Sequence, residues 1–196
     1  MNSIVNITEA GAARCKRYAC AMVDEYHNGQ SERSRSCQVP GREIDQNINM
    51  QTFGRMAEAA FCKWLDVNPN TMLDWTVGAD NGADVVIPPF RIDVKSSPLV
   101  HAQYLIWPVS KIEFYAETSS NILALVRASQ SQNSFEIVGW VTKEWFADHH
   151  ETASAHDALK LDAGTWFMRA GNLWCPEILK ATIKEASLQM VIEGVT

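Results

Sequence analysis

One short segment, residues 82–97, constrains the fold of this chain more than any other. It reads Gly-Ala-Asp-Val-Val-Ile-Pro-Pro-Phe-Arg-Ile-Asp-Val-Lys-Ser-Ser, two β-prone runs on either side of a Pro-Pro pair. Successive side chains of a strand point to opposite faces, so Ile92 and Val94 face one way while Asp93 and Lys95 face the other. The pattern predicts a hairpin with one face in the core and a carboxylate beside an ammonium on the other.

The turn of this hairpin predicts a second carboxylate at the same place. A tight turn at Pro88-Pro89 brings Asp84 back opposite Asp93, although Pro-Pro is not a favoured two-residue hairpin turn and leaves the exact register open. Two carboxylates that converge from neighbouring strands suit a hard divalent cation such as Mg²⁺, which prefers oxygen ligands in octahedral geometry. The backbone carbonyl of Val94 is a further candidate oxygen ligand.

A helix upstream supplies a third acid. Apolar residues recur at helical spacing from about Met50 to Leu65, and Glu58 borders this apolar face. A carboxylate in that position is costly without a partner, and a metal-bound water or Lys95 would provide one. Beside a metal, Lys95 would orient or deprotonate water, or stabilise charge that develops on a phosphate.

These acidic and basic residues resemble the signature of a known superfamily. Asp84 is followed after eight residues by Asp93-Val94-Lys95, and Glu58 lies on an upstream helix. This arrangement resembles the PD-(D/E)xK nucleases, which include restriction endonucleases, Holliday-junction resolvases, recombination exonucleases and many small phage or prophage nucleases. An Asp-x-Lys tripeptide alone carries little information, and the specificity comes from its combination with the hairpin aspartate and the helical glutamate.

The resemblance covers about residues 53–97 well and extends more loosely to Trp140. The sequence departs from the superfamily pattern at Ala83, where the usual residue is Pro, and agrees with its frequent Lys-Ser-Ser ending at Ser96 and Ser97. The resemblance implies a restriction-endonuclease-like α/β fold, with a central mixed sheet flanked by helices.

The resemblance also implies Mg²⁺-dependent hydrolysis of phosphodiester bonds in DNA, with Mn²⁺ as a substitute. Asp84, Asp93 and the Val94 carbonyl would bind the metal, Glu58 would bind a second metal or its water, and Lys95 would position the attacking water. DNA is the expected partner, and a homodimer is left open. No signal peptide or long apolar run is recognisable, so we expect a cytoplasmic protein without membrane association.

Three alternatives stay open at this point. A protein of this fold can lack catalysis and instead bind nucleic acid or a protein partner, and the net charge of −6 with a pI of about 5.3 favours this reading slightly. RNA is another substrate, because fold does not fix substrate. The plainest alternative is a hairpin with an ordinary surface salt bridge between Asp93 and Lys95.

The rest of the chain predicts one mixed α/β domain over residues 1–196. We expect an N-terminal helix within residues 8–28, capped by Thr8, and then a polar loop over residues 29–48. The other expected elements are strands at 83–87, 90–95, 104–108, 121–128, 135–141 and 165–169, a short helix at 143–148 capped by Thr142, and a final helix after Pro176.

Other candidate ligands are interpreted as structural. Asp80 precedes an Asn-Gly turn signal, and Asp74 lies further from the motif. His149, His150 and His156 match no standard metal spacing, so a solvated loop is expected there. The five cysteines form no Cys-x-x-Cys pair, which favours free thiols over a disulfide framework or an iron–sulfur cluster.

Overall fold

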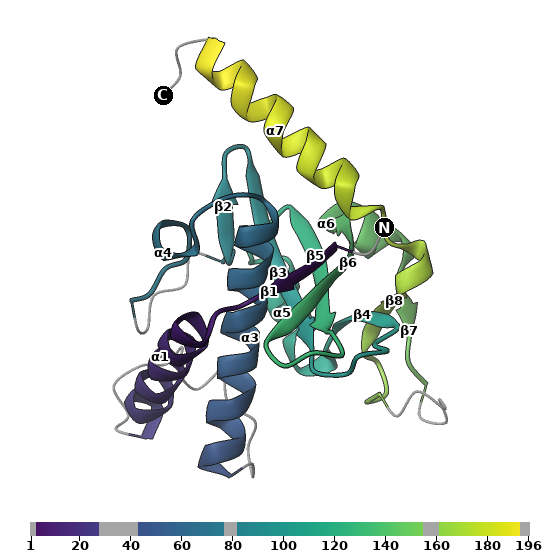
Figure 1. The fold of residues 1–196 in the computed structure, drawn as a ribbon. Helices are drawn as coiled ribbons and strands as arrows, with labels where there is room; N and C mark the ends of the chain where they lie inside the picture. The colour runs from purple at the N-terminus through teal and green to yellow at the C-terminus, as the bar shows by residue number, and fades with distance from the viewer. Residues whose placement is uncertain (1–2, 28–42, 77–81, 155–160, 193–196) are drawn as a thin grey trace.

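The computed structural model describes residues 3–27, 43–76, 82–154 and 161–192. These residues form a mixed α/β fold, in which helices cover one face of a five-stranded sheet and a smaller sheet with two short helices packs on the other (Figure 1).

The large sheet has the order β1-β6-β5-β3-β2. Its strands are β1 (Ser3–Asn6), β2 (Val85–Ile87), β3 (Phe90–Ser97), β5 (Ile122–Ala128) and β6 (Ser134–Thr142). β3 and β5 run parallel, and the remaining neighbours are antiparallel. The sheet is therefore mixed, as the sequence predicts.

Strand β3 shows the predicted alternation. Ile92 and Val94 are buried in the core beneath the long helix α3 (Ile44–Trp64). Asp93 and Lys95 point to the opposite face of the sheet and are only partly buried. In the β2–β3 hairpin Val85 lies opposite Ile92, and this register places Asp84 level with Asp93.

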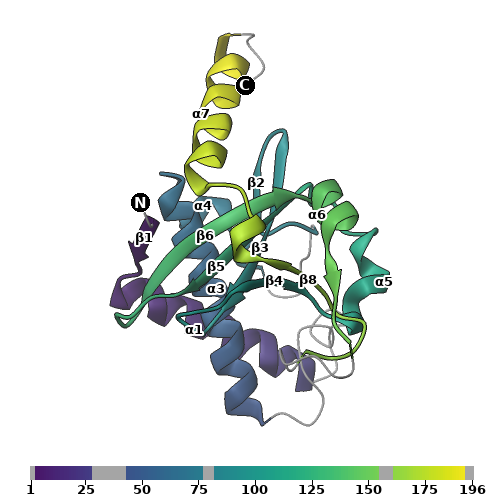
Figure 2. The ribbon, with the colours of Figure 1, turned by 90° about the vertical axis from the view of Figure 1, so that its right-hand side faces the viewer.

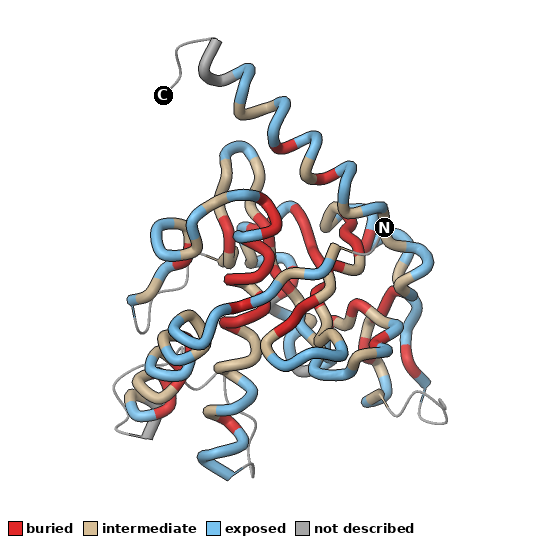
Figure 3. The backbone as a smooth tube through the Cα atoms, viewed as in Figure 1, coloured by how far each residue is buried: buried red, intermediate tan, exposed pale blue. Residues whose placement is uncertain are grey.

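α3 covers the first face of the sheet, and α1 (Glu9–His27) packs against α3. α1 begins after Thr8, whose hydroxyl accepts a hydrogen bond from the Gly11 amide. The core between the helices and the sheet is apolar, and its largest fully buried residues include Phe61, Phe135 and Ile92. Figure 3 shows this burial in the middle of α3 and along the strands.

A second core fills the opposite face. It lies under a three-stranded sheet of order β4-β8-β7, made of β4 (Tyr104–Trp107), β7 (Glu151–Thr152) and β8 (Trp166–Arg169). The short helices α5 (Ile112–Tyr115) and α6 (Lys143–His149) lie side by side at the edge of this core (Figure 2). Their Tyr115 and Phe146 rings have centroids 6.0 Å apart. Its buried residues are Leu105, Trp107, Tyr115, Leu123, Leu125, Val141, Phe146 and Met168.

The last helix, α7 (Pro176–Ile192), packs through its first half only. Leu179 and Ile183 are buried in the first core, whereas Leu188 is 58% exposed, and the helix projects from the body in both ribbon views (Figures 1 and 2). Three short elements complete the structure: α4 (Pro69–Met72), η1 (Val109–Lys111) and η2 (Ala170–Asn172). Within the described ranges, every helix is too short or too polar to cross a membrane.

The structure corrects two expectations. The polar loop expected over 29–48 ends earlier, because α3 begins at Ile44. Asp45 in the first turn of α3 interacts favourably with the positive end of the helix dipole. Residues 29–42 lie outside the described residues. The solvated loop expected around the histidines is also wrong in its first part. His149 ends α6, and the His150 ring stacks on Trp166 with centroids 4.2 Å apart.

Candidate functional site

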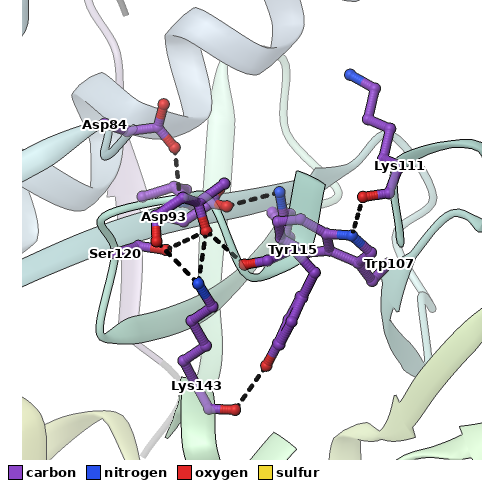
Figure 4. A network of polar contacts seen from close by, with 10 residues as sticks. Asp84, Asp93, Trp107, Lys111, Tyr115, Ser120 and Lys143 are labelled. Carbon is purple, nitrogen blue, oxygen red and sulfur yellow. Dashed lines mark hydrogen bonds and ion pairs between the residues drawn. The ribbon is translucent and has the colours of Figure 1, made fainter. Parts of the chain in front are cut away.

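Asp84 lies directly before β2, at the open end of the β2–β3 hairpin. Its amide donates a hydrogen bond to the Ile92 carbonyl at 2.9 Å, and its carboxylate Oδ2 accepts one from the Val94 amide at 2.7 Å (Figure 4). In an extended strand the N–H and C=O of one residue point to the same side, so the Val94 carbonyl also lies along this edge. The hairpin therefore places the Asp84 carboxylate and the predicted backbone ligand together.

The environment of Asp84 disfavours its charged form. Burial raises its pKa well above the usual value, and the charges of Glu58 and Asp93 raise it further. The hydrogen bond from the Val94 amide and the charge of Lys95 act in the opposite direction. Glu58, Asp93 and Lys95 each lie close enough to Asp84 to affect its pKa, but Glu58 approaches from the α3 side of the sheet while Asp93 and Lys95 lie on its other face.

Asp93 and Lys95 form an ion pair on the other side of β3. Lys95 Nζ lies 2.7 Å from Asp93 Oδ2 and 3.9 Å from the centroid of the Trp107 ring. The side chains keep 14% and 27% of their exposure, respectively, so the pair is accessible from solvent. Residues two apart on a strand share a face, which explains why the Asp-x-Lys spacing produces this contact.

Glu58 reaches the site from α3, but its carboxylate is paired with Arg55. Arg55 lies one turn earlier on α3, is 7% exposed, and also donates to the Asp74 carbonyl. Its guanidinium lies 4.1 Å from the Tyr18 ring centroid and 5.0 Å from that of Trp75. The sequence analysis missed this arginine, although the spacing of three residues to Glu58 is a recognisable helical pair.

A group of residues around Asp93 was also missed by the sequence analysis. Trp107 and Tyr115 meet edge to face with centroids 4.8 Å apart, and we call this pair the aromatic floor. Lys95 lies over Trp107, and Lys143 Nζ lies 4.9 Å from the Tyr115 centroid. Figure 4 shows Asp93 between these groups. Lys143 is 50 residues from Asp93 in sequence, and no local pattern links the two.

The donor set fits a divalent cation in its chemistry. Carboxylates of Glu58, Asp84 and Asp93 and the Val94 carbonyl are hard oxygen ligands, and the like-charge repulsion at Asp84 is what a bound cation would relieve. However, across the described residues no three His, Cys, Asp or Glu side chains already stand in a metal-binding arrangement. One carboxylate oxygen of Glu58, Oε2, is paired with Arg55.

The remaining sequence candidates lie elsewhere. Asp74 caps its own turn, with Oδ1 accepting from the Thr76 amide at 2.9 Å, and Asp80 and His156 lie outside the described residues. Cys15 and Cys62 are buried free thiols, and burial raises their pKa to about 11 and about 12, which keeps them protonated. A surface hollow of about 420 Å³ between α3 and the β5–β6 turn contains none of the four predicted residues.

Comparison with known proteins adds no relative. Neither a protein-family model nor a curated protein nor a solved structure matches the chain. The functional argument therefore depends on the geometry described above.

Proposed function

We propose that this protein is a Mg²⁺-dependent nuclease with a restriction-endonuclease-like fold, which hydrolyses phosphodiester bonds in DNA. The observation that carries the proposal is the hydrogen bond that the Asp84 carboxylate accepts from the Val94 amide. Val94 is the residue between Asp93 and Lys95, and both of these side chains affect the pKa of Asp84. An Asp from the end of one strand and an Asp-x-Lys on the next are held in register by a hairpin, as such a site requires.

In this proposal the residues have separate roles. Asp84, Asp93 and the Val94 carbonyl would hold the cation, and Glu58 would bind a second cation or its water. The cation, when bound, supplies Lewis-acid stabilisation of the phosphate and lowers the pKa of water. Lys95 would orient the water whose oxygen adds to phosphorus as a P–O ester bond breaks and the leaving oxygen takes up a proton.

A second candidate function has its own observation in favour. The Glu58 carboxylate is bound by Arg55, which would suit a protein of this fold that binds nucleic acid or a protein without cleaving it. The intact set of Asp84, Asp93 and Lys95 favours catalysis, since the ion pair between Asp93 and Lys95 stays accessible.

The test is incubation of the full chain with single-stranded, double-stranded and branched DNA and with RNA, in Mg²⁺, Mn²⁺ or EDTA. Cleavage of DNA that needs the metal and is lost in Asp93→Ala supports the proposal. Cleavage of RNA alone would change the substrate class. Binding without cleavage in both metals would favour the second function, and activity that persists in EDTA would overturn the metal-dependent proposal.

A further inference from the structure

The Lys143 ammonium lies at the candidate site but comes from a distant element. Lys143 is the first residue of α6, and its side chain points toward the side of Asp93 and Ser120 (Figure 4). Burial lowers the pKa of Lys143, and the charge of Asp93 partly offsets this by favouring the protonated form. Asp93 therefore interacts with two ammonium groups, Lys95 by direct contact and Lys143 across a short space.

The backbone and side chain of Lys143 are both fixed. Its amide donates to the Asn121 carbonyl at 3.0 Å, and its carbonyl accepts from the Tyr115 hydroxyl at 2.5 Å. Its Nζ donates to the Thr118 carbonyl at 2.8 Å and to Thr118 Oγ1 at 2.9 Å. A lysine side chain held in this way has already lost most of its rotamer freedom before any ligand arrives.

The ammonium keeps one donor for a ligand. A lysine ammonium has three N–H donors, and Thr118 accepts two of them; within the described part of the chain the third has no hydrogen-bond acceptor. The aromatic floor lies beneath both lysines, with Lys95 over Trp107 and Lys143 over Tyr115. Aromatic rings in place of water lower the local dielectric response and strengthen the attraction between an ammonium and an anion.

We propose that Lys143 is a second phosphate-binding residue of this site, and that it and Lys95 bind the oxygens of a nucleic-acid phosphate above the aromatic floor. This inference rests on the proposed function and adds to it a residue outside the hairpin motif. In a chain with a net charge of −6, the two lysines would offset part of the negative charge that the carboxylates of this site present to a polyanion.

The chain offers a matched control and a separating variant. Lys111 lies beside the same aromatic floor, where its carbonyl accepts from Trp107 Nε1 at 2.8 Å, but its ammonium points away from Asp93 (Figure 4). Lys143→Met and Lys111→Met therefore remove the same charge, in one case from an ammonium directed toward Asp93 and in the other from one directed away from it. Thr118→Val removes the side-chain oxygen that accepts a hydrogen bond from Lys143, while the charge of Lys143 is kept. This variant therefore distinguishes a lysine that contacts phosphate from a lysine that only holds the fold together.

The experiment measures binding of a duplex DNA oligonucleotide in EDTA over a series of salt concentrations, with thermal melting of every variant. We expect Lys143→Met to weaken binding about tenfold and to lower the slope of log K against log salt by about 1, because one phosphate contact is lost. Lys143→Arg should keep most of the slope. Lys111→Met and Thr118→Val should leave the slope at the wild-type value.

Three results would overturn the inference. These are unchanged binding in Lys143→Met, an equal change of slope in Lys111→Met, and an equal loss in Thr118→Val and Lys143→Met together with lowered melting temperatures. If the wild type cleaves DNA with Mg²⁺ and Lys143→Met binds and cleaves like it, only this inference fails. If the wild type neither binds nor cleaves nucleic acid, the proposed function fails; titration with inorganic phosphate, followed by NMR, then decides whether Lys143 binds the anion.

Discussion

The molecule contains two acid–base pairs beside β3, and they differ in what surrounds them. Arg55 and Glu58 lie on the helical side, where Tyr18 and Trp75 cover the guanidinium, and the two side chains are 9% and 16% exposed. Asp93 and Lys95 lie on the other face, where 14% and 27% of their side-chain surface stays exposed. The two acids are about equally buried, so the pairs differ in their bases: Arg55 is enclosed by protein, while Lys95 keeps an open side.

The comparison separates structural charge from functional charge. A buried pair holds neighbouring elements together, and removal of one partner leaves the other charge without compensation. A base that stays in contact with water contributes less to stability and is free to exchange its partner for a ligand. The following predictions test this difference, starting with the largest effect.

The largest effect should be on catalysis at Lys95. Lys95→Ala should reduce single-turnover cleavage by about 10²–10⁴ while the fold and most metal binding stay intact, because the ammonium is not a metal ligand. Lys95→Arg should not rescue activity, since a guanidinium keeps its proton and is bulkier. Asp93→Ala should lose metal binding and cleavage together. Calorimetry measures metal binding, and single-turnover rates at saturating Mg²⁺ measure cleavage. Normal cleavage by a normally folded Lys95→Ala protein would mean that Asp93 and Lys95 form only a surface salt bridge.

The next largest effect should be on stability at Arg55. Arg55→Met should lower the free energy of unfolding by about 3–5 kcal/mol, because it leaves Glu58 without its ion-pair partner and also removes the contacts of the guanidinium with the Asp74 carbonyl, Tyr18 and Trp75. Lys95→Met should cost less, about 1 kcal/mol, because the Lys95 side chain is 27% exposed against 9% for Arg55, and Asp93 keeps the favourable charge of Lys143. Denaturant unfolding at neutral pH compares the two variants. Equal losses in both would remove the distinction between the pairs.

A smaller effect of opposite sign is expected at Asp84. Its pKa is raised in the folded protein, so the folded state holds a proton that the unfolded state releases above about pH 4, and stability falls as pH rises from there through the raised pKa. Asp84→Asn should therefore be more stable than the wild type at neutral pH without metal, and the two should converge below about pH 4. At this chain length each kcal/mol gained raises the melting temperature by about 2–4 °C.

The measurement is thermal melting of both proteins across this pH range in EDTA. Asp84→Asn should also lose cleavage, which is the usual exchange of stability against activity at a strained site. A melting curve for Asp84→Asn that falls below the wild type at every pH would show that the ionised carboxylate stabilises the fold.

The smallest effect should be at an exposed pair. Arg169 Nε lies 2.9 Å from Glu151 Oε1, and the two side chains are 53% and 45% exposed. Arg169→Gln should change the free energy of unfolding by about 0–1 kcal/mol. This variant sets the baseline for the other two pairs in the same unfolding experiment. A loss as large as that of Arg55→Met would mean that solvent exposure does not determine how much an ion pair contributes to the free energy of unfolding.

The sequence by itself determined many of the local elements and the order of charges along them, although it missed strands β1 and β7. The alternation of Ile92, Asp93, Val94 and Lys95 fixed which side chain lies on which face of β3, because a strand has a period of two. The cap at Thr142, whose hydroxyl accepts from the Trp145 amide at 3.1 Å, lies where its residue type predicts. Such features depend only on backbone geometry and neighbours in the chain.

The tertiary structure alone decided which charges meet. Arg55 captures Glu58 because Tyr18 from α1 and Trp75 after α4 cover it, and Lys143 lies near Asp93 because β3 and β5 pair in parallel and β6 carries α6 to the same face. The smaller sheet, which joins β4 to β8, also depends on contacts distant in sequence. Local periodicity states which way a side chain points, but its partner and its exposure to water are set by elements that only the folded chain brings together.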